Sequence, residues 1–561
     1  MVTPSKMTTL ASGTTTASQT LRIIPLGGLG EVGLNSTLFE YGTDRLLVDA
    51  GLMFPEREMP GVDIVVPDFS ILRTGLGKPH AVLLTHGHED HVGALPFLLQ
   101  EFSLPVYGTP LTLALVSEKL KEFQLDDRIE LIPLTPRRPL VFGAFTVEPI
   151  RITHSIVDGV AFGVTTPVGR VVHTGDFKID ETPVDDRPID VERFNQYGDE
   201  GTLLLLSDST NAEREGATAS ERVVGNTFMT LFPQAEKKIV VATFSSNIHR
   251  IQQVCEAAEK TGRKVFLNGR SILQNSQQAM DLGYLKVPDA ILRPVEEMSR
   301  TPDSETVIVT TGSQGEQNSA LTRMAKGEHK EIRIGPGDMV ILSSRMIPGN
   351  ERLIGRMINR LMKRGARVVH EKSHRVHVSG HAAREDQARM LSWVRPRFFM
   401  PIHGEYRQLI AHAQVAEKMG IPSDRILLCE DGDVVEVTAE KIFKAGRAPA
   451  GRIFIDGKGA GDVDLDVLRD RRWIGEDGFL VVLLHPDGRP EIVSRGFVFD
   501  EGSQTLLPRL EQVARRALES LAAEEATDDD AIKTRVKNAL KKEIAKSMDR
   551  RPMILPVRVQ A

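Results

Sequence analysis

The sequence predicts an α/β protein that is divided into several domains. The chain has 561 residues, which is enough for about three or four domains that each bury a sizeable core. Short apolar runs typical of buried strands alternate with segments whose apolar residues recur at helical spacing, and this alternation indicates sheets covered by helices. Several of the apolar runs end in histidine or aspartate, so the strand ends are the first place to look for chemistry.

The composition is that of an ordinary globular protein, with 41% hydrophobic and 26% charged residues. The net charge of −6, from 70 basic and 76 acidic residues, excludes a uniformly basic protein but not a locally positive cleft. Cys255 and Cys429 are the only cysteines, and their wide separation favours a reducing cytoplasm over a disulfide framework. No apolar run reaches the roughly 18 residues of a membrane span. Residues 1–20, rich in Thr, Ser and Ala, are predicted to be a disordered leader.

The first predicted strands lie at residues 21–25, 36–40 and 45–48. The glycine-rich segment 27–33 lacks the G-x-G-x-x-G spacing before a helix, so we reject a dinucleotide-binding role and expect a tight turn. Asp49 follows the third strand, and on sequence alone it is either a turn residue or a functional carboxylate.

The segment Thr85-His86-Gly87-His88-Glu89-Asp90-His91 follows a predicted strand at residues 81–84. Imidazole and carboxylate are ligands for zinc or manganese, and so dense a set at a strand end suggests more than one ion. His86 and His88 share one side of an extended chain, whereas Asp90 and His91 lie past a turn, where a helix over 92–100 is predicted. A solvated polar loop is the alternative, but it does not explain three histidines in six positions when the chain has only 15.

Two more candidate ligands follow later strands. His154 comes after the apolar segment 147–153, and Asp176 comes after 170–175. A lone histidine after a strand is usually structural, but together with the first cluster these positions indicate ligands. His173 is a rival for the histidine position. Another predicted strand, at 203–206, leads into Ser207-Asp208-Ser209-Thr210-Asn211.

A second α/β domain is predicted over residues 221–370. Short strands separated by helices imply a parallel sheet with helices on both faces. The glycine-rich turn at 311–315 either closes a loop or presents backbone N–H groups to phosphate. The predicted strands lie at 239–242, 265–267, 307–309 and 339–342, and the predicted helices at 248–258, 271–281 and 350–364.

The chain then returns to histidine-rich segments. His377 and His381 lie in His-Val-Ser-Gly-His-Ala, and His403 lies in Pro-Ile-His-Gly-Glu. The pattern His-x-His-x-Asp-His at 86–91 resembles the signature of the metallo-β-lactamase superfamily. Asp208, His381 and His403 resemble the inserted-domain branch known as β-CASP. The similarity is closest to the ribonuclease J family and covers residues 21 to about 555, through segments 53–56, 61–63, 244–250, 377–382 and 401–405.

The resemblance implies an architecture in five parts after the leader. It places a metallo-β-lactamase αββα sandwich at 21–220 and 371–440, with the inserted parallel-sheet β-CASP domain at 221–370. A linker is expected at 441–462, rich in Gly, Ala and Lys. A small α+β domain at 463–561 then supports oligomerisation. Its predicted strands lie at 479–484, 491–496 and 554–559, with a turn at 486–488 and helices at 505–523 and 529–548.

The resemblance also implies a ligand set for two divalent ions per subunit, zinc or manganese. His86, His88 and His154 are expected on one ion, Asp90, His91 and His403 on the other, and Asp176 between them. Asp49 becomes a carboxylate that orients ligands. His381 is the expected donor of a proton to the leaving 3′-oxygen, and Asp208 is expected to orient it and keep it protonated. The catalytic residues expected are therefore His381, Asp208 and Asp90.

The function implied is two-metal hydrolysis of RNA, by a 5′→3′ exoribonuclease that also cuts internally, in mRNA decay and rRNA processing. Single-stranded RNA is the expected substrate, and a homodimer or homotetramer and other RNA-decay proteins are the expected partners, with no membrane. In DNA-directed relatives the last histidine position tends to be apolar, so His403 favours RNA. A DNA-directed β-CASP nuclease and a catalytically silent RNA-binding scaffold remain the alternatives.

A 5′ exonuclease must also hold the terminal phosphate with groups that are not metal ligands. His377, Ser379 and Gly380 precede His381 in a turn whose N–H groups and side chains can converge on an anion. Ser245, Ser246 and Asn247 offer a matching set before a predicted helix. The alternative is that these three residues only cap that helix.

Overall fold

The computed structural model describes residues 20–56, 58–74, 77–347, 349–457, 459–497, 500–522 and 528–559. The predicted leader therefore lies outside the described residues, apart from Thr20. The chain forms two compact units, one of Met1–Met53 with Val66–Arg452 and one of Phe54–Val65 with Ile453–Ala561. Among the described residues, no helix is both long and apolar enough to cross a membrane.

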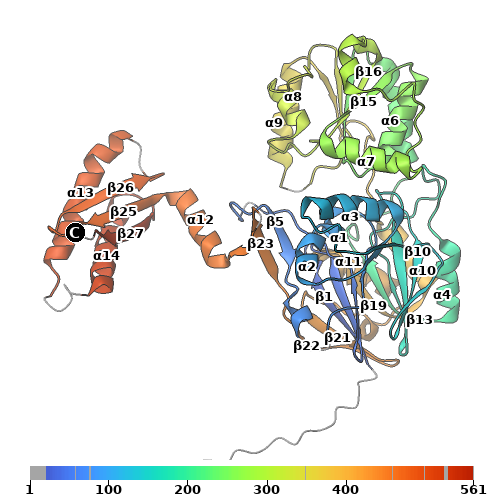
Figure 1. The fold of residues 1–561 in the computed structure, drawn as a ribbon, viewed down its shortest axis with the longest axis horizontal. Helices are drawn as coiled ribbons and strands as arrows, with labels where there is room; N and C mark the ends of the chain where they lie inside the picture. The colour runs from blue at the N-terminus through green and yellow to red at the C-terminus, as the bar shows by residue number, and fades with distance from the viewer. Residues whose placement is uncertain are drawn as a thin grey trace, which may run out of the picture. The chain divides into compact units, whose positions relative to one another are not determined.

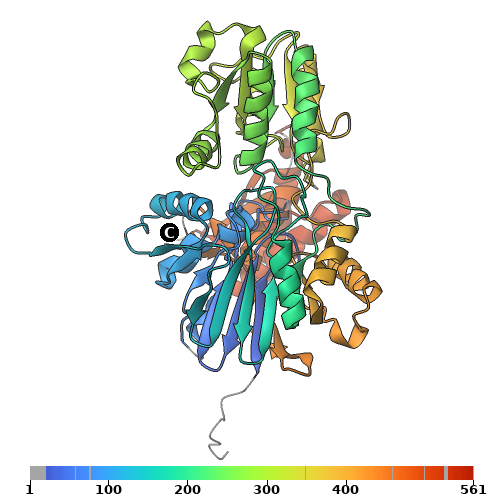
Figure 2. The same ribbon diagram turned by 90° about the vertical axis from the view of Figure 1, so that its right-hand side faces the viewer.

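The first unit contains two sheets packed face to face (Figures 1 and 2). Side chains from both sheets, such as Leu21 and Phe39 from one and Val147 and Phe162 from the other, share one buried core. The larger sheet has the order β22 (Ile442–Arg447), β21 (Asp433–Val437), β1 (Leu21–Gly27), β3 (Ser36–Tyr41), β4 (Asp44–Val48), β6 (Val82–Leu83), β7 (Val106–Gly108) and β8 (Leu131–Pro133). The smaller has the order β19 (Pro396–Ile402), β13 (Thr202–Asp208), β12 (Gly169–His173), β11 (Val160–Thr166), β10 (Phe145–Arg151) and β9 (Leu140–Phe142).

Helices cover the smaller sheet on its outer face. Phe194 and Met390 lie in a second core together with Val172, Leu205 and Phe399 of that sheet. This layering confirms the predicted sandwich. The helices of the sandwich are α1 (Glu89–Val92), α2 (Leu95–Glu101), α3 (Pro110–Glu122), α4 (Val191–Glu200), α10 (Arg384–Val394) and α11 (Tyr406–Lys418).

The helix predicted at 92–100 is two short helices. The first begins at Glu89, because His88 has extended backbone and stands at the N-cap. It ends at Gly93, where an added Cβ would come within 2.4 Å of the Leu52 side chain, and the second begins at Leu95. The consequence is that Asp90 and His91 lie on helix α1 itself.

A five-stranded parallel sheet is inserted into this unit, as predicted. Its order is β15 (Lys264–Asn268), β16 (Thr306–Thr310), β14 (Ile239–Ala242), β17 (Met339–Leu342) and β18 (Arg367–Val369). Successive residues face opposite sides, so Val241 joins a core with α5 to α7 while Val240 joins a core with α8 and α9 (Figure 1). The helices are α5 (Arg222–Leu231), α6 (Ile248–Lys260), α7 (Arg270–Asp281), α8 (Ala320–Lys326) and α9 (Glu351–Lys363).

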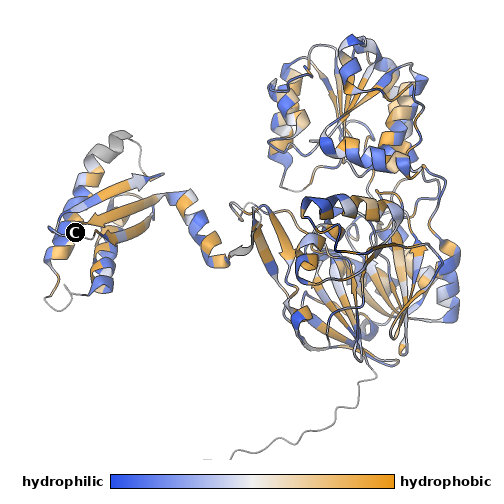
Figure 3. Cartoon of the chain, viewed as in Figure 1, coloured by the Kyte–Doolittle hydropathy of each residue, from blue (hydrophilic) through white to orange (hydrophobic). Residues whose placement is uncertain are grey.

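The second unit contains a three-stranded sheet in which β25 (Phe479–Leu484) pairs with β26 (Pro490–Arg495) antiparallel and with β27 (Met553–Arg558) parallel. Leu480, Val482 and Ile554 pack against α13 (Asp500–Glu519) and α14 (Asp529–Ser547), and α12 (Leu465–Asp477) precedes the sheet. Figure 3 shows hydrophobic residues concentrated on these strands. The α+β class predicted for this region is confirmed.

The segment 441–462 differs from the linker that we predicted. It contains β22, β23 (Arg452–Asp456) and β24 (Gly459–Val463). Strand β22 completes the larger sheet by pairing with β21, and β23 lies between β24 and β5 (Ile64–Pro67). Composition missed these strands because Gly, Ala and Lys are depleted in strands, so pairing with the neighbouring strands, and not the local sequence, stabilises them. The domain boundaries expected from the resemblance stay predictions.

Candidate metal centre

The candidate ligands gather at one edge of the sandwich. Strands β12, β13 and β19 are mutually parallel, so Asp176, Asp208 and His403, which follow or end them, come to the same edge. Two further parts of the site lie at the same edge. They are residues 86–91, which follow β6, and His154, which follows β10. The fold thus brings together residues that are more than 300 positions apart in the sequence.

The first group consists of His86, His88, His154 and Asp176, whose ligand atoms lie within 4.8 Å of one another. His88 Nδ1 is 3.0 Å from His86 Nε2 and 3.1 Å from His154 Nε2. The Oδ2 atom of Asp176 is 3.7 Å from His86 Nε2 and 3.8 Å from His154 Nε2. Three ring nitrogens and a carboxylate converge in this way on one point.

The second group consists of Asp90, His91, His403 and the same Asp176. The Oδ2 atom of Asp176 is 3.2 Å from His91 Nε2 and 3.4 Å from His403 Nε2. Asp90 Oδ2 is 3.7 Å and 3.9 Å from the same two nitrogens. Asp176 therefore belongs to both groups, whereas the rival His173 belongs to neither and its Nδ1 accepts a hydrogen bond from Gly175 N.

In three histidines the outer ring nitrogen, Nδ1, which points away from the centre, lies at hydrogen-bond distance from an oxygen atom. The Nδ1 atom of His91 lies 2.8 Å from Asp49 Oδ2, that of His154 lies 2.7 Å from Gly380 O, and that of His403 lies 2.7 Å from Asn35 Oδ1. Since these oxygens only accept, each Nδ1 carries a proton, and a neutral ring then presents the lone pair of its Nε2 to the centre.

The residues present fit a divalent cation. Asp176 Oδ1 and His403 Nε2 are buried atoms without a hydrogen-bond partner among the described residues. Unpaired buried polar atoms are costly, and a cation between them satisfies both. Nitrogen and carboxylate ligands suit zinc or manganese, and the arrangement suggests divalent metal binding.

The electrostatics of the centre keep three of its histidines neutral and favour a proton on a fourth, His91. Burial lowers the pKa of His86 and His154 well below the ordinary value, and it lowers the pKa of His88 to about 4. Burial alone would raise the pKa of Asp176, but His403 and His91 hold it well below its usual range. Burial also acts against protonation of His91, yet Asp176 and Asp49 raise its pKa well above the ordinary value. A cation bound there displaces a proton.

His381 and Asp208 form a pair beside the centre. His381 Nδ1 lies 2.9 Å from Asp208 Oδ2, and its ring is partly exposed while Asp208 is buried. Burial lowers the pKa of His381, but the charge and hydrogen bond of Asp208 outweigh it, and the pKa is raised to about 9. With Nδ1 bonded to Asp208, Nε2 is the nitrogen left for a substrate.

The turn before His381 is tied to the centre by its backbone. Gly380 O accepts from His154 Nδ1, and an added Cβ at Gly380 would lie 2.6 Å from His154 Cε1, so only glycine fits. Ser379 Oγ accepts from His381 N at 3.2 Å and from Asn211 Nδ2 at 2.8 Å. Burial and the cations around His377 keep its pKa well below the ordinary value, so its imidazole is neutral.

The second expected set of phosphate donors has structural partners of its own. Asn247 Oδ1 accepts from Arg250 N and caps α6, as the alternative interpretation expected for that residue. Ser245 Oγ accepts from Asn275 Nδ2 at 3.2 Å, and Ser246 is half-buried. Within the described ranges, no hydrogen bond joins these residues to His377 or Ser379.

Sequence analysis did not identify four residues that support the site. Asn35 holds His403, Thr85 donates its N–H and hydroxyl to Asp49, and Asn211 and Thr218 both donate to His381 O. Only a weak signal in the sequence points to Asn35, because it is an asparagine that follows a glycine-rich turn. Thr218 carries no local signal, because its bonds link segments that are distant in sequence.

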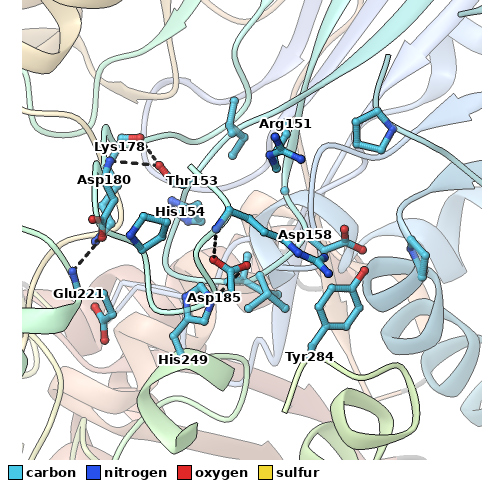
Figure 4. Close-up of a pocket in the computed structure, with 18 of the residues that line it drawn as sticks. Arg151, Thr153, His154, Asp158, Lys178, Asp180, Asp185, Glu221, His249 and Tyr284 are labelled. Atoms are coloured by element: carbon cyan, nitrogen blue, oxygen red, sulfur yellow. Dashed lines mark hydrogen bonds and ion pairs between the residues drawn. The ribbon is translucent and has the colours of Figure 1, made fainter. Parts of the chain in front are cut away.

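A cavity of about 320 Å³ adjoins the centre (Figure 4). His154, Lys178 and Asp180 line it from the sandwich, and His249 and Tyr284 line it from the inserted domain. The close-up shows the ion pair of Lys178 with Asp180, whose atoms are 3.3 Å apart. A mixed, charged cavity of this size beside a reactive centre is suited to part of a polar substrate.

Comparison with known families gives four matches along the chain. Residues 29–215 match the metallo-β-lactamase superfamily, and residues 236–361 match the ribonuclease J β-CASP domain. Residues 365–425 match a domain described as a Zn-dependent metallo-hydrolase RNA specificity domain, and residues 466–561 match the ribonuclease J C-terminal domain.

Curated proteins similar to the chain include three bacterial ribonucleases J. The Synechocystis sp. protein is 42% identical over 95% of this chain and 84% of its own length. The Thermus thermophilus protein is 43% identical over 96% of this chain and 95% of its own length. The Mycolicibacterium smegmatis protein is 40% identical over 96% of this chain and 97% of its own length. A solved structure from Enterococcus faecalis V583, titled a protein of unknown function, shares the fold with a TM-score of 0.53 at 16% identity, over 74% of this chain and 100% of that chain.

Proposed function

Because the chain belongs to the ribonuclease J family, we propose that it is a metal-dependent ribonuclease that removes nucleotides from RNA in the 5′→3′ direction and also cuts internally. The role we propose is RNA decay and maturation. The observation that carries the proposal is that two ligand groups, one with three histidines and one with Asp90, His91 and His403, share Asp176. A third, overlapping group joins Asp176 and His403 to Asp208 and His381.

The proposed centre holds two divalent ions, zinc or manganese, with His86, His88 and His154 around one and Asp90, His91 and His403 around the other. Divalent cations bound there supply positive charge that clamps a phosphodiester and activates water for attack. The protein fixes this geometry by holding the outer nitrogens of His91, His154 and His403 on oxygen acceptors.

The leaving 3′-oxygen needs a proton, and His381 is the proposed donor. Its Nδ1 bond to Asp208 leaves Nε2 free to face the substrate, and the buried carboxylate favours the protonated ring. Asp208 itself is held by the N–H groups of Thr210 and Phe177, so it stays in place as the proton moves.

For 5′→3′ removal we propose that the terminal phosphate binds at His377, Ser379 and Gly380, together with Ser245, Ser246 and Asn247. The first three are supported by their position, because the turn that carries them also contacts His154 and leads into His381. The RNA specificity domain matched over residues 365–425 contains this turn, which supports RNA over DNA as substrate.

We further propose that the chain acts in the cytoplasm as a homodimer or homotetramer, together with other RNA-decay proteins. The C-terminal sheet supports self-association, because Ile554 is buried under the helices whereas Leu555 and Val557 on the other face are 54% and 37% exposed.

The test is digestion of one RNA sequence labelled at its 5′ end and carrying a monophosphate, triphosphate or hydroxyl there, with the matched DNA beside it. We expect mononucleotides from monophosphate RNA and internal fragments from all three RNAs. Release of label from DNA at an equal rate would refute the RNA assignment. Metal content is measured on the same preparation. If metal is bound but no strand is hydrolysed, the result indicates a catalytically silent scaffold.

A further inference from the structure

His173 is a buried histidine beside the centre that belongs to none of its ligand groups. It is the last residue of β12, and its Nδ1 atom accepts a hydrogen bond from Gly175 N at 3.1 Å. A backbone N–H group can only donate, so Nδ1 carries a lone pair and the proton of the neutral ring is on Nε2. His173 therefore cannot offer Nδ1 to a cation without releasing Gly175.

The hydrogen bond between His173 and Gly175 shapes the turn that leads into Asp176. Gly175 is buried and has a φ of +57°, and an added Cβ would lie 3.0 Å from Thr85 Cβ. A buried amide is costly to leave unpaired, and the ring of His173 satisfies this one. In an Asx-turn the side chain of Asn or Asp accepts from the N–H group two residues later, and His173 makes the same connection with a ring nitrogen.

The other side of the same turn is held by strand β13. Thr174 N donates to Leu206 O at 3.0 Å, and Thr174 Oγ1 accepts from Asp208 N at 3.1 Å. With Gly175 N bonded to His173, the backbone before Asp176 is fixed on both sides. The position of Asp176 matters for the whole centre, because its Oδ2 atom lies between 3.2 and 3.8 Å from nitrogens of four histidines.

The ring of His173 also fills space beside the ligands. A small cavity of about 10 Å³ is lined by His173 together with Asp49 and with His91, Asp176 and His403 of the second ligand group. This volume is about that of one water-sized probe, so the ring leaves little free space there. A test of the hydrogen bond must therefore be separated from a change in packing.

We propose that His173 is a positioning residue that fixes Asp176, and through it both proposed metal ions at once, an inference that rests on the proposed metal centre. Asp49 and Asn35 hold histidines of the second ligand group only. His173 instead acts on the turn before the carboxylate that belongs to both groups. Loss of a residue that orients a ligand typically weakens metal binding by about 10- to 100-fold, and here both ions should weaken together.

The experiment compares wild type with His173→Asn, His173→Leu and His173→Phe, each loaded with manganese and then titrated with a chelator. Asparagine keeps an acceptor in place of Nδ1, leucine has the same branched shape without an acceptor, and phenylalanine keeps a ring. We expect His173→Leu and His173→Phe to bind both ions about 10- to 100-fold more weakly, and His173→Asn to stay close to wild type. The Tm of the metal-free proteins shows whether each variant folds.

His329→Phe is the matched control. His329 is a buried histidine of the inserted domain, and its Nδ1 accepts from Glu331 N at 3.3 Å and from Ile332 N at 3.1 Å. The change removes the same kind of hydrogen bond at a residue that belongs to no ligand group. Both ions should therefore stay bound as in wild type.

The outcomes separate the role of His173 from that of the centre. Wild-type affinity for both ions in His173→Leu and His173→Phe overturns the proposal. Equal losses in His173→Asn and His173→Leu also overturn it, because packing and not the hydrogen bond then explains them. Loss of one ion alone contradicts an action through Asp176. A wild-type chain that retains no divalent ion contradicts the proposed centre itself, and this result is read before any variant is compared.

Discussion

The metal centre and the surroundings of His377 are adjacent, yet they are built in opposite ways. At the centre, the outer nitrogens of His91, His154 and His403 are each held by a buried oxygen, and the inner nitrogens converge on Asp176. Around His377, the exposed Arg345 and Arg214 have no carboxylate partner among the described residues.

Under the proposed function, this difference assigns each region to a different step. A centre whose ligands are oriented before anything binds serves the chemical step, because it avoids reorganisation in the transition state. A region with uncompensated charge is completed only by its ligand, so it serves selection of the substrate. Changes in the first region should lower turnover for every RNA, and changes in the second should alter the discrimination between RNA ends.

The largest expected effect is that of His381→Ala. Loss of a general acid lowers turnover by about 100- to 10,000-fold, on both monophosphate and hydroxyl RNA. Both metals should remain, because His381 is not in the proposed ligand set. Elemental analysis and single-turnover rates measure the two properties, and His374→Ala, an exposed histidine nearby, is the control. A missing metal in His381→Ala would place His381 among the ligands.

A second variant probes the orienting bonds of the metal centre. Asn35→Ala removes the acceptor of His403 Nδ1, and loss of such a partner typically weakens metal binding by about 10- to 100-fold. Titration with a chelator, read as metal retained per chain, should show one weakened ion and one unchanged. Asn35→Asp keeps an acceptor and should bind more tightly than Asn35→Ala. Equal loss of both ions would refute the division into two groups.

The region of His377 is tested by removing its neutral donors. His377→Ala and Ser379→Ala should reduce the preference for 5′-monophosphate over 5′-hydroxyl RNA by about tenfold each, the size of one hydrogen bond to a charged group. Internal cleavage of the same RNAs, measured by fragment length, does not use the terminal phosphate and serves as the internal reference. Wild-type ratios in both variants would contradict the pocket.

A smaller effect is expected on stability, through a half-buried acid pair outside both regions. Asp431 Oδ1 accepts from Leu29 N, and its neighbour Glu31 is paired with Arg452 while Arg447 binds the Asp431 carbonyl. Burial and the neighbouring Glu31 raise the pKa of Asp431 to about 8. An acid whose pKa is raised by folding contributes stability that is fully present below its unfolded pKa of 3.8 and is lost progressively as pH rises from there to about 8.

Asp431→Asn cannot ionise, so its Tm should fall less than that of the wild type between about pH 4 and pH 8. Thermal unfolding at half-unit steps of pH measures this, and Asp424→Asn in an exposed turn is the control. Parallel curves for the wild type and Asp431→Asn would show that the pair does not titrate in this range.

The smallest effect on chemistry is expected from the C-terminal unit, none of whose described residues belongs to either region. Deleting residues 478–561 should lower self-association, because it removes the sheet face with Leu555 and Val557. The deletion starts after α12, so that β22, which belongs to the larger sheet, stays intact. Sedimentation measures the oligomer, and metal content should not change. An unchanged oligomer would refute the assignment.

Local patterns were enough to predict much of this protein. The cluster at residues 86–91 is contiguous, so its chemistry is visible in the sequence. The alternating faces of β14, where Val240 and Val241 enter different cores, follow from strand geometry and made the parallel sheet predictable. The family resemblance added the ligand sets, and the structure brings those residues together.

Only the tertiary structure decided the bonds that span long stretches of chain. Asn35 and His403 are 368 positions apart, His154 and Gly380 are 226 apart, and Asn211 reaches Ser379 over 168. Strand β22 looked like a linker for a different reason: residues such as Lys, Ala and Gly are depleted in strands, and pairing with the adjacent strand β21 stabilises it. A hydrogen bond between distant segments depends on where folding places both partners, and no periodicity or spacing in the sequence encodes that position.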